Sequence, residues 1–268
     1  VLLRSLELWL FLEDFYFYDN QFSRKTENVL MEFRVQTLLR RYLSEDGKSL
    51  NLNGRGLDDK GLAALSRTES LSNVETLSLR NNGISYRGIL ALAESKNASN
   101  LKSLNLMSNE IGDMGATSLA DSTQLGKLEK LNLEGAKISS TGIFALAQSK
   151  TLTNLTSLNL TRNDLTEKGI KHLANSKNFK SLRILWVADV FMGDPGIQAL
   201  AKSGNLSHLE ELFAIGNSIT NEGLSSIATS ESLKSLKHLD LRRNNFKFDG
   251  IYPLTDSPKI KNLEKFRF

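Results

Sequence analysis

The chain has 268 residues, of which 40% are apolar and 24% charged, proportions typical of an ordinary globular protein. It contains no cysteine, which excludes disulfide bonds, thiolate metal ligands and thiol nucleophiles. The net charge of +4 is mildly basic, but Lys and Glu interleave along the chain, and this mixing argues against a nucleic-acid-binding stripe.

Residues 1–46 follow no fixed period, and their apolar clusters predict helices. Four charged residues interrupt the first cluster, so we expect neither a membrane span nor a signal peptide there. An alternative for this segment is a separate docking module, such as a degenerate ubiquitin-ligase-recruiting box, although the Leu-Pro opening of such a box is missing. The clusters comprise Leu8, Leu10, Leu12 and Phe15, then Val29, Leu30, Phe33, Leu38, Leu39 and Tyr42.

From residue 47 onward the sequence repeats every 27 residues without insertion. Each row reads L-x-x-L-x-L-x-x-N-x-I/L, followed by Gly-Ile-x-x-Leu-Ala-x-Ser. The alternating leucines predict a short strand with one buried face, and the later spacing predicts a helix. The rows start at Val74, Leu101, Leu128, Leu155, Leu182, Leu209, Leu236 and Leu263, after a degenerate row near Gly47.

Three columns of the repeat have a structural interpretation. Ser85, Ser139, Thr166 and Thr220 are predicted helix N-caps. A recurring glycine, such as Gly169, would let each helix backbone approach its neighbours closely. The turn asparagines are expected to stack and to satisfy backbone groups in the bend. These are Asn82, Asn109, Asn163, Asn217 and Asn244.

The rows resemble the leucine-rich-repeat family, in the 27-to-29-residue type exemplified by ribonuclease inhibitor. The resemblance covers residues 47–268. It implies an α/β solenoid shaped as a horseshoe, with a parallel concave sheet and convex helices. We therefore expect two parts: a helical N-terminal cap over residues 1–46, and a repeat domain over residues 47–268 with about eight repeats and a partial last one.

Residues that could perform catalysis or bind a cofactor do not gather in the sequence. His172, His208 and His238 occupy three different columns, so no zinc site is expected. His238 and Asp240 share a strand face but have no aligned serine nucleophile. The glycines belong to the repeat, not to a phosphate-binding loop. The prediction is a non-enzyme without catalytic residues, metal, cofactor or small-molecule substrate.

The exposed strand positions predict a partner-binding patch. Small polar residues fill the concave columns until the row that starts at Leu182, where apolar side chains begin. That row also departs from the repeat at Val190, Phe191, Met192 and Pro195. A contiguous exposed apolar patch usually marks a partner site. The predicted patch is Ile184, Trp186, Ala188, Phe213 and Ile215, with Arg183, Arg242 and Arg243 as its charged rim.

Two structural alternatives for the patch remain open: Trp186 and Phe213 could cover each other, or a folded-back N-terminal segment could cover both. Functionally, we expect a protein–protein interaction module that uses the concave face. The repeats also resemble in style those of bacterial leucine-rich-repeat effectors. This resemblance implies a virulence protein that acts on host proteins after secretion into the reducing host cytoplasm, and a ubiquitin-ligase adaptor is one such role.

A second candidate is a regulator of a small GTPase, similar to repeat-type GTPase activators. Such a protein would use a rim arginine, for example Arg80 or Arg162. Nucleic-acid binding is the least expected function, and strong salt dependence would be its mark.

Overall fold

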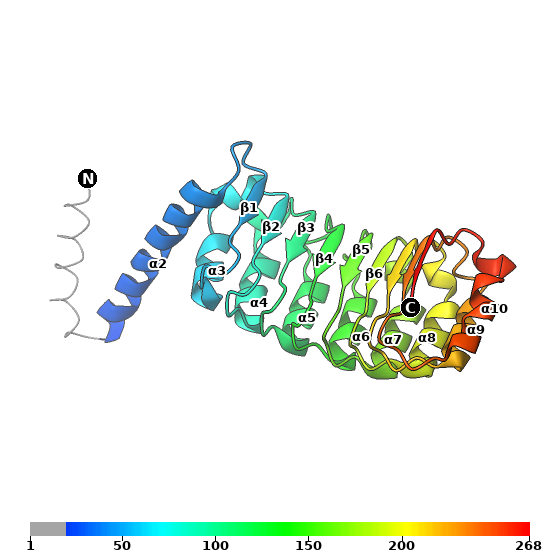
Figure 1. The fold of residues 1–268 in the computed structure, drawn as a ribbon. Helices are drawn as coiled ribbons and strands as arrows, with labels where there is room; N and C mark the ends of the chain where they lie inside the picture. The colour runs from blue at the N-terminus through cyan, green and yellow to red at the C-terminus, as the bar shows by residue number, and fades with distance from the viewer. Residues whose placement is uncertain (1–19) are drawn as a thin grey trace.

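The computed structural model describes residues 20–268, with side chains from residue 26 onward, and it forms a stack of strand–helix rows (Figure 1). The strands form one parallel sheet in chain order, as the repeat predicts. The strands are β1 (Ser49–Asn51), β2 (Thr76–Ser78), β3 (Ser103–Asn105), β4 (Lys130–Asn132), β5 (Ser157–Asn159), β6 (Ile184–Trp186), β7 (Glu211–Phe213), β8 (His238–Asp240) and β9 (Lys265–Arg267).

The helices of the rows lie on the side opposite the sheet, and α2 (Asn20–Tyr42) lies at the N-terminal end of the stack. The row helices are α3 (Asp58–Ser66), α4 (Tyr86–Glu94), α5 (Gly112–Asp121), α6 (Ser140–Gln148), α7 (Thr166–Asn175), α8 (Gly193–Ala201), α9 (Asn221–Ala228) and α10 (Tyr252–Thr255). Short 3-10 helices are η1 (Glu69–Asn73), η2 (Lys96–Ala98), η3 (Lys177–Phe179), η4 (Gly204–Leu206), η5 (Phe248–Gly250) and η6 (Pro258–Ile260). Within the described part of the chain, none of the helices is long and apolar enough to cross a bilayer.

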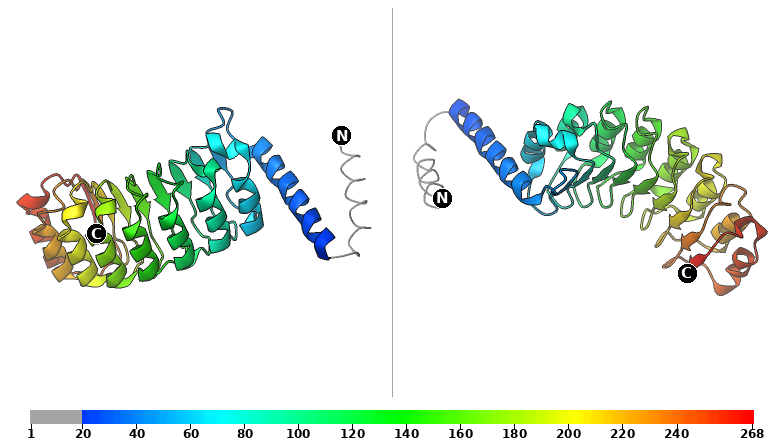
Figure 2. Two further views of the ribbon diagram at one scale, coloured as in Figure 1. Left: turned by 180° about the vertical axis from the view of Figure 1, so that it is seen from behind. Right: turned by 90° about the horizontal axis from the view of Figure 1, so that it is seen from above.

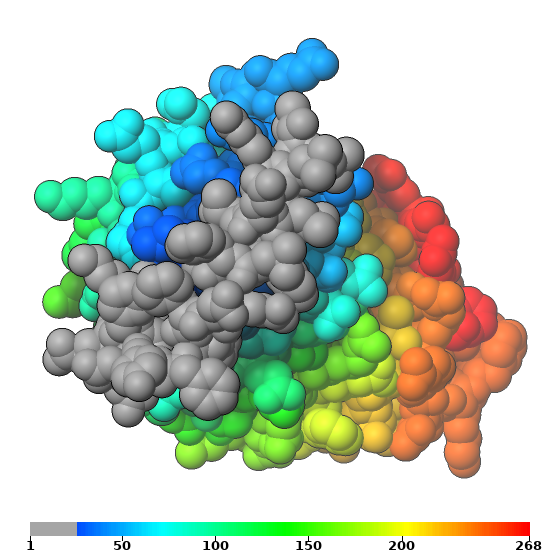
Figure 3. All heavy atoms as spheres, turned by 90° about the vertical axis from the view of Figure 1, so that its left-hand side faces the viewer, coloured from blue at the N-terminus to red at the C-terminus, as the bar shows by residue number. Residues whose placement is uncertain are grey.

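The stack is curved. Seen from above, it bends into an arc with the helices on the outer side and the strands on the inner side (Figure 2, right). Seen from the N-terminal end, the last rows project to one side of the earlier ones (Figure 3). The strand faces between the leucines therefore line a concave surface.

The strand register follows the 27-residue period. Leu50 pairs with Leu77, Leu158 with Leu185, and Leu212 with Leu239. These central leucines are fully buried beneath the sheet, where they join the helix residues in one continuous core. Stacking thus buries the apolar face that a single row could not cover alone.

The turn asparagines form the expected ladder. Asn82 Oδ1 accepts the backbone N–H groups of Arg55 and Leu57 in the preceding row (3.0 and 3.1 Å), while its Nδ2 donates to the carbonyl oxygens of Leu52 and Leu79. Asn109, Asn163, Asn217 and Asn244 do the same in their rows. In two rows the asparagine position holds an apolar residue, Ala136 or Val190. The turn of the row before each of these therefore lacks the side-chain oxygen acceptor.

A second ladder joins the C-terminal ends of the helices. The buried Ser149 hydroxyl donates to the carbonyl of Ala120 (2.6 Å) and accepts from the N–H of Leu152 (3.1 Å). Each such serine satisfies a carbonyl that the preceding helix leaves unpaired. The sequence pattern contained this serine, but we had not assigned it this role. Its equivalents are Ser95, Ser122, Ser176, Ser203, Ser230 and Ser257.

All four predicted N-cap side chains accept a backbone N–H, three of them from the N-cap position itself. Ser85, Ser139 and Thr220 each accept a backbone N–H at the start of their helix. An aspartate in the preceding row anchors each of them; Ser85, for example, donates through N and Oγ to Asp59 (2.7 and 2.6 Å). Thr166 makes the same bond, since its Oγ1 accepts the N–H of Lys168 at 3.3 Å. It differs in its backbone: it is the first residue of α7, with a left-handed φ of 57°, and Leu165 precedes it at the N-cap position.

The described part of the N-terminal segment is helix α2, which packs beside the first row. Val35 and Leu39 are buried in the common core. Arg34 donates through Nη2 to the carbonyl oxygens of Arg55 and Gly56 (2.7 and 2.9 Å). The Tyr42 ring lies 4.4 Å from the guanidinium carbon of Arg55. The predicted cluster from Leu8 to Phe15 lies outside the described residues, so the division into residues 1–46 and 47–268 stays a prediction.

Candidate functional site

Strands β6 and β7 bring together the aromatic residues of the predicted patch. Trp186 pairs directly with Phe213 in the parallel register. Their rings are nearly parallel, with centroids 5.2 Å apart and planes 7° apart. His238, on β8, contacts the other side of Phe213 edge-on at 4.7 Å. The concave face thus carries a stacked Trp186–Phe213 pair, whose side chains occupy the same position of adjacent strands about 4.8 Å apart, and an imidazole that meets Phe213 edge-on from the neighbouring column.

The apolar patch is half-buried rather than fully exposed. Ile184, Trp186, Phe213 and Ile215 all have intermediate exposure. Ala188 is only 7% exposed, so it contributes almost no surface, contrary to its predicted place in the patch. Trp186 and Phe213 cover each other, as one alternative proposed, but only on one face of each ring. Part of the remaining ring surface is accessible.

The three predicted rim arginines are all paired with carboxylates. Arg183 pairs with Glu210, which also binds Lys237. Arg243 Nη2 lies 3.3 Å from Asp189 Oδ1. Arg242 holds Asp240 through two bonds, Nε to Oδ1 at 2.9 Å and Nη2 to Oδ2 at 2.7 Å. Arg242 is thus held by a buried carboxylate, whereas Arg183 and Arg243 form ion pairs at the surface.

Asp240 departs from the expectation for its column. It occupies the same concave column as Trp186 and Phe213, whose side chains are half-buried, but it is completely buried beneath Arg242. Burial raises the pKa of this carboxyl, but the hydrogen bonds and charge of Arg242, together with the charge of Arg267, outweigh that effect and hold the pKa below its ordinary value. Asp240 is thus an internal anion that fixes the Arg242 side chain.

A groove of about 260 Å³ borders Trp186 on the side away from Phe213. Its walls and floor come from β3, β4, β5 and the indole of Trp186. The floor contains three asparagines, Asn105, Asn132 and Asn159, with Ser103 and Ser157 beside them. The Oδ1 atoms of the three asparagines accept the N–H of Met107, Glu134 and Thr161 at 2.9–3.0 Å. This turn geometry fixes the amides and directs their Nδ2 groups away from their own backbone.

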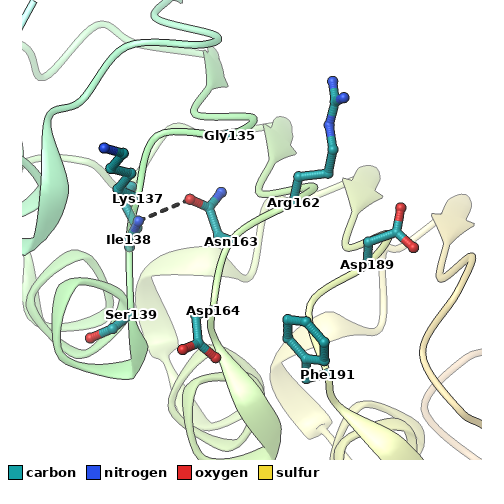
Figure 4. Close-up of a pocket in the computed structure, with 9 residues that line it drawn as sticks. All are labelled: Gly135, Lys137, Ile138, Ser139, Arg162, Asn163, Asp164, Asp189 and Phe191. Atoms are coloured by element: carbon teal, nitrogen blue, oxygen red, sulfur yellow. Dashed lines mark hydrogen bonds between the residues drawn. The ribbon is translucent and has the colours of Figure 1, made fainter.

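A second pocket, of about 610 Å³, lies at the rim where the strands turn toward the helices. Figure 4 shows Lys137, Ile138 and Ser139 on one side and Phe191 on the other, with Asn163 and Asp164 between them. Asn163 Oδ1 accepts the Ile138 N–H in its floor. Phe191 is 71% exposed and has a left-handed φ of 59°. The sequence marked Phe191 as a departure from the repeat, but we did not include it in the predicted site.

The two arginines suggested for a GTPase regulator differ in their surroundings. Arg162 is tied to Glu134, whereas the Arg80 side chain forms no hydrogen bond or ion pair within the described part of the chain. Because Glu134 belongs to the same chain, the guanidinium of Arg162 is already paired before any partner protein binds.

The histidines lie apart, as their columns predicted. His172 packs against Phe144 at 4.9 Å, and Nδ1 of His208 lies 3.2 Å from the Lys180 carbonyl oxygen. His238 approaches Glu211 at 3.7 Å rather than Asp240, and its buried Nε2 has no hydrogen-bond partner among the described residues. Across residues with described side chains, no cluster of three or more His, Asp or Glu could hold a metal ion.

Comparisons with known proteins agree with this architecture. No curated protein sequence matches the chain significantly. Among solved structures, an internalin from Listeria monocytogenes aligns with a TM-score of 0.52 and 23% identity, over 82% of this chain and 66% of the internalin. The chain thus spans slightly less than two thirds of that protein, and the likeness concerns the fold.

The sequence profile described as "Leucine Rich repeat" matches five segments, at residues 70–93, 97–120, 127–147, 151–174 and 232–254. The rows that carry Trp186 and Phe213 fall between the last two matches, where the sequence departs most from the repeat. Five profile matches, a register fixed at 27 residues and the internalin-like solenoid lead to one conclusion: the chain belongs to the leucine-rich-repeat family.

Proposed function

We propose that this chain is a non-enzymatic protein-interaction module that binds a protein partner on its concave face, centred on β6 and β7. Solenoid repeats create extended concave surfaces of the kind used for binding. The stacked pair of Trp186 and Phe213 is the observation that carries the proposal, because buried aromatic anchors dominate the energetics of protein interfaces.

The surroundings of the pair support this function. Ile184 and Ile215 extend the apolar surface on either side, and Arg183, Arg242 and Arg243 lie around it. An apolar centre with a polar, charged periphery is the usual anatomy of an interface. Because Arg242 is already held by the buried Asp240, little of its side-chain entropy would be lost when a partner binds.

The nature of the partner is a finer part of the proposal. The style of the repeats and the absence of cysteine support a bacterial effector that works in the reducing host cytoplasm and binds a host protein there. Recruitment of that protein to a ubiquitin ligase is one outcome of such binding. The chain has no cysteine with which to act as a thioester-forming ligase itself.

The test is a pull-down from eukaryotic cell lysate with the wild type and with a Trp186→Ala/Phe213→Ala double variant. A matched control is Leu90→Ala/Phe144→Ala, which removes two exposed apolar side chains from the convex helices α4 and α6. The captured protein is then purified and its binding to the three proteins measured directly.

We expect the concave variant to lose binding and the convex variant to retain it. Equal binding by the wild type and the concave variant would overturn the proposal. Loss of binding only in the convex variant would place the partner on the helices instead.

A further inference from the structure

We propose that the partner segment held in the concave groove is a proline-rich stretch in the polyproline II conformation, lying across the strands with a proline ring against Trp186. This inference rests on the proposed function, since it takes the concave face as the binding surface. It concerns the groove lined by Asn105, Asn132, Asn159 and Trp186.

Trp186 provides the flat apolar wall of this groove. Phe213 stacks on one face of the indole, and the groove lies on the opposite side, toward β5. Trp186 as a whole is half-buried, and the part of its side chain that lines the groove is accessible. Aromatic-lined grooves are the usual docking sites of proline-rich segments, because the preformed polyproline II helix loses little entropy on binding.

The floor of the groove presents hydrogen-bond donors. Oδ1 of Asn105 and of Asn132 already accepts a backbone N–H from two residues further along. Within the described residues, the Nδ2 groups of these two asparagines donate to no acceptor. Asn159 differs, because its Nδ2 donates to Glu134 at 3.2 Å. Asn105 and Asn132 thus offer N–H groups to an incoming carbonyl oxygen.

This donor floor distinguishes between ligand backbones. A β-extended peptide presents N–H and C=O groups along each edge, so its N–H groups would face other donors. A proline residue has no N–H, and a polyproline II helix leaves its carbonyl groups unpaired and accessible. The groove therefore favours a chain that brings carbonyl oxygens and apolar rings together.

The spacing also agrees. Asn132 and Trp186 lie two strands apart on the sheet, which corresponds to about 9.6 Å. One turn of polyproline II contains three residues and rises about 9.3 Å. A proline against Trp186 would therefore place a carbonyl three residues away close to the Asn132 amide, and Asn105 continues the same line by one further strand.

The experiment titrates the full chain with a blocked decaproline peptide, with a Gly-Ser peptide of equal length, and with cellopentaose as a neutral sugar that also stacks on indoles. Binding is followed by NMR through the indole N–H of Trp186 and the side-chain amides of the asparagines. Asn132→Asp keeps the Oδ1 acceptor of the turn but replaces the donor with an acceptor. Asn51→Asp is the matched control, because Asn51 Oδ1 makes the same turn bond to Asn53 and lies five strands from Trp186.

We expect decaproline alone to bind, with shifts confined to Trp186, Asn105 and Asn132. Asn132→Asp and Trp186→Ala should each weaken it about tenfold or more, and Asn51→Asp should not. Absence of decaproline binding, equal affinity in Asn132→Asp, or preference for cellopentaose would each overturn the inference. If the lysate partner still depends on Trp186 and Phe213 in those cases, the proposed function stands without it.

Discussion

Asp189 and Arg243 lie two rows apart, and their side chains meet across Gly216, with Oδ1 and Nη2 separated by 3.3 Å. Gly216 occupies the same turn position in the row between them. A Cβ built on Gly216 would lie 2.1 Å from Asp189 Oδ1. The missing side chain is therefore what allows the ion pair to span the intervening row beside the aromatic patch.

Gly216→Ala should destabilise the fold, because φ at this position is 65° and the new Cβ displaces Asp189. We expect a loss of about 1–2 kcal/mol from the left-handed backbone, and at most about 1 kcal/mol more from the ion pair. Gly135→Ala is the control, since its φ of 60° is similar and nothing lies within 4 Å. Chemical denaturation of both variants measures the difference. Equal losses would mean that the ion pair contributes nothing to stability.

Asp240 should make the stability depend on acid. Its folded pKa is lowered, so its contribution is fully present above the unfolded value of about 3.9 and is lost as the pH falls through the folded pKa. Asp240→Asn removes this contribution at neutral pH. We expect the variant to melt below the wild type at pH 7, with the gap narrowing below about pH 4. A gap that is constant from pH 7 to pH 3 would contradict this assignment.

The two missing rungs of the asparagine ladder predict a stabilising change. Ala136→Asn would provide an amide oxygen for the N–H groups of Asn109 and Ile111, as Asn163 does for Ala136 and Ile138. A hydrogen bond of this kind contributes about 1 kcal/mol net. The melting temperature of Ala136→Asn should rise, while Asn163→Ala should lower it. A fall in Ala136→Asn would show that the turn around Ala136 has no room for the amide.

The regular part of the fold could be predicted because every row has the same length. A fixed period of 27 residues places Leu77 beside Leu104 and Trp186 beside Phe213. The two-residue alternation along each strand predicts that the leucine pair is buried and that the aromatic pair faces the concave surface. The aromatic cluster was therefore predicted from its column positions alone.

The irregular features depend on neighbours that the repeat does not determine. Asp240 is buried because Arg242, two residues along, folds back over it. Thr166 begins α7 with a left-handed φ, and the row before it has Ser140 in place of the aspartate that anchors Ser85, Ser139 and Thr220. The Nδ2 groups of Asn105 and Asn132 face the groove because the Oδ1 atom of each side chain accepts the backbone N–H two residues further along. The repeat pattern does not determine this orientation of the amides.

The assignment of faces on β6 can be tested by stability alone. Leu185→Ala removes a fully buried side chain and should cost about 2–5 kcal/mol. Trp186→Ala removes a half-buried ring, whose stacking on Phe213 contributes about 0.5–1.5 kcal/mol, and it should cost less in total than Leu185→Ala because the ring leaves no closed cavity in the core. Urea denaturation followed by circular dichroism compares the two variants. A larger loss for Trp186→Ala would mean that the indole belongs to the core.

Phe191 provides the last prediction, because its exposure and its backbone both disfavour the folded state. A left-handed φ costs an ordinary residue about 1–2 kcal/mol, and Gly56 and Gly83 occupy the same turn position in earlier rows. Phe191→Gly should therefore keep or raise the free energy of unfolding by up to about 1 kcal/mol, since the more flexible unfolded chain offsets part of the gain.

Met192→Ala, at the next residue, is the matched control. Its side chain is 1% exposed, so its removal should cost about 2–5 kcal/mol. If Phe191→Gly also weakens the concave-face interaction while leaving the fold intact, the exposed ring serves binding from the rim pocket. A Phe191→Gly variant that unfolds as readily as Met192→Ala would instead make the ring part of the packing.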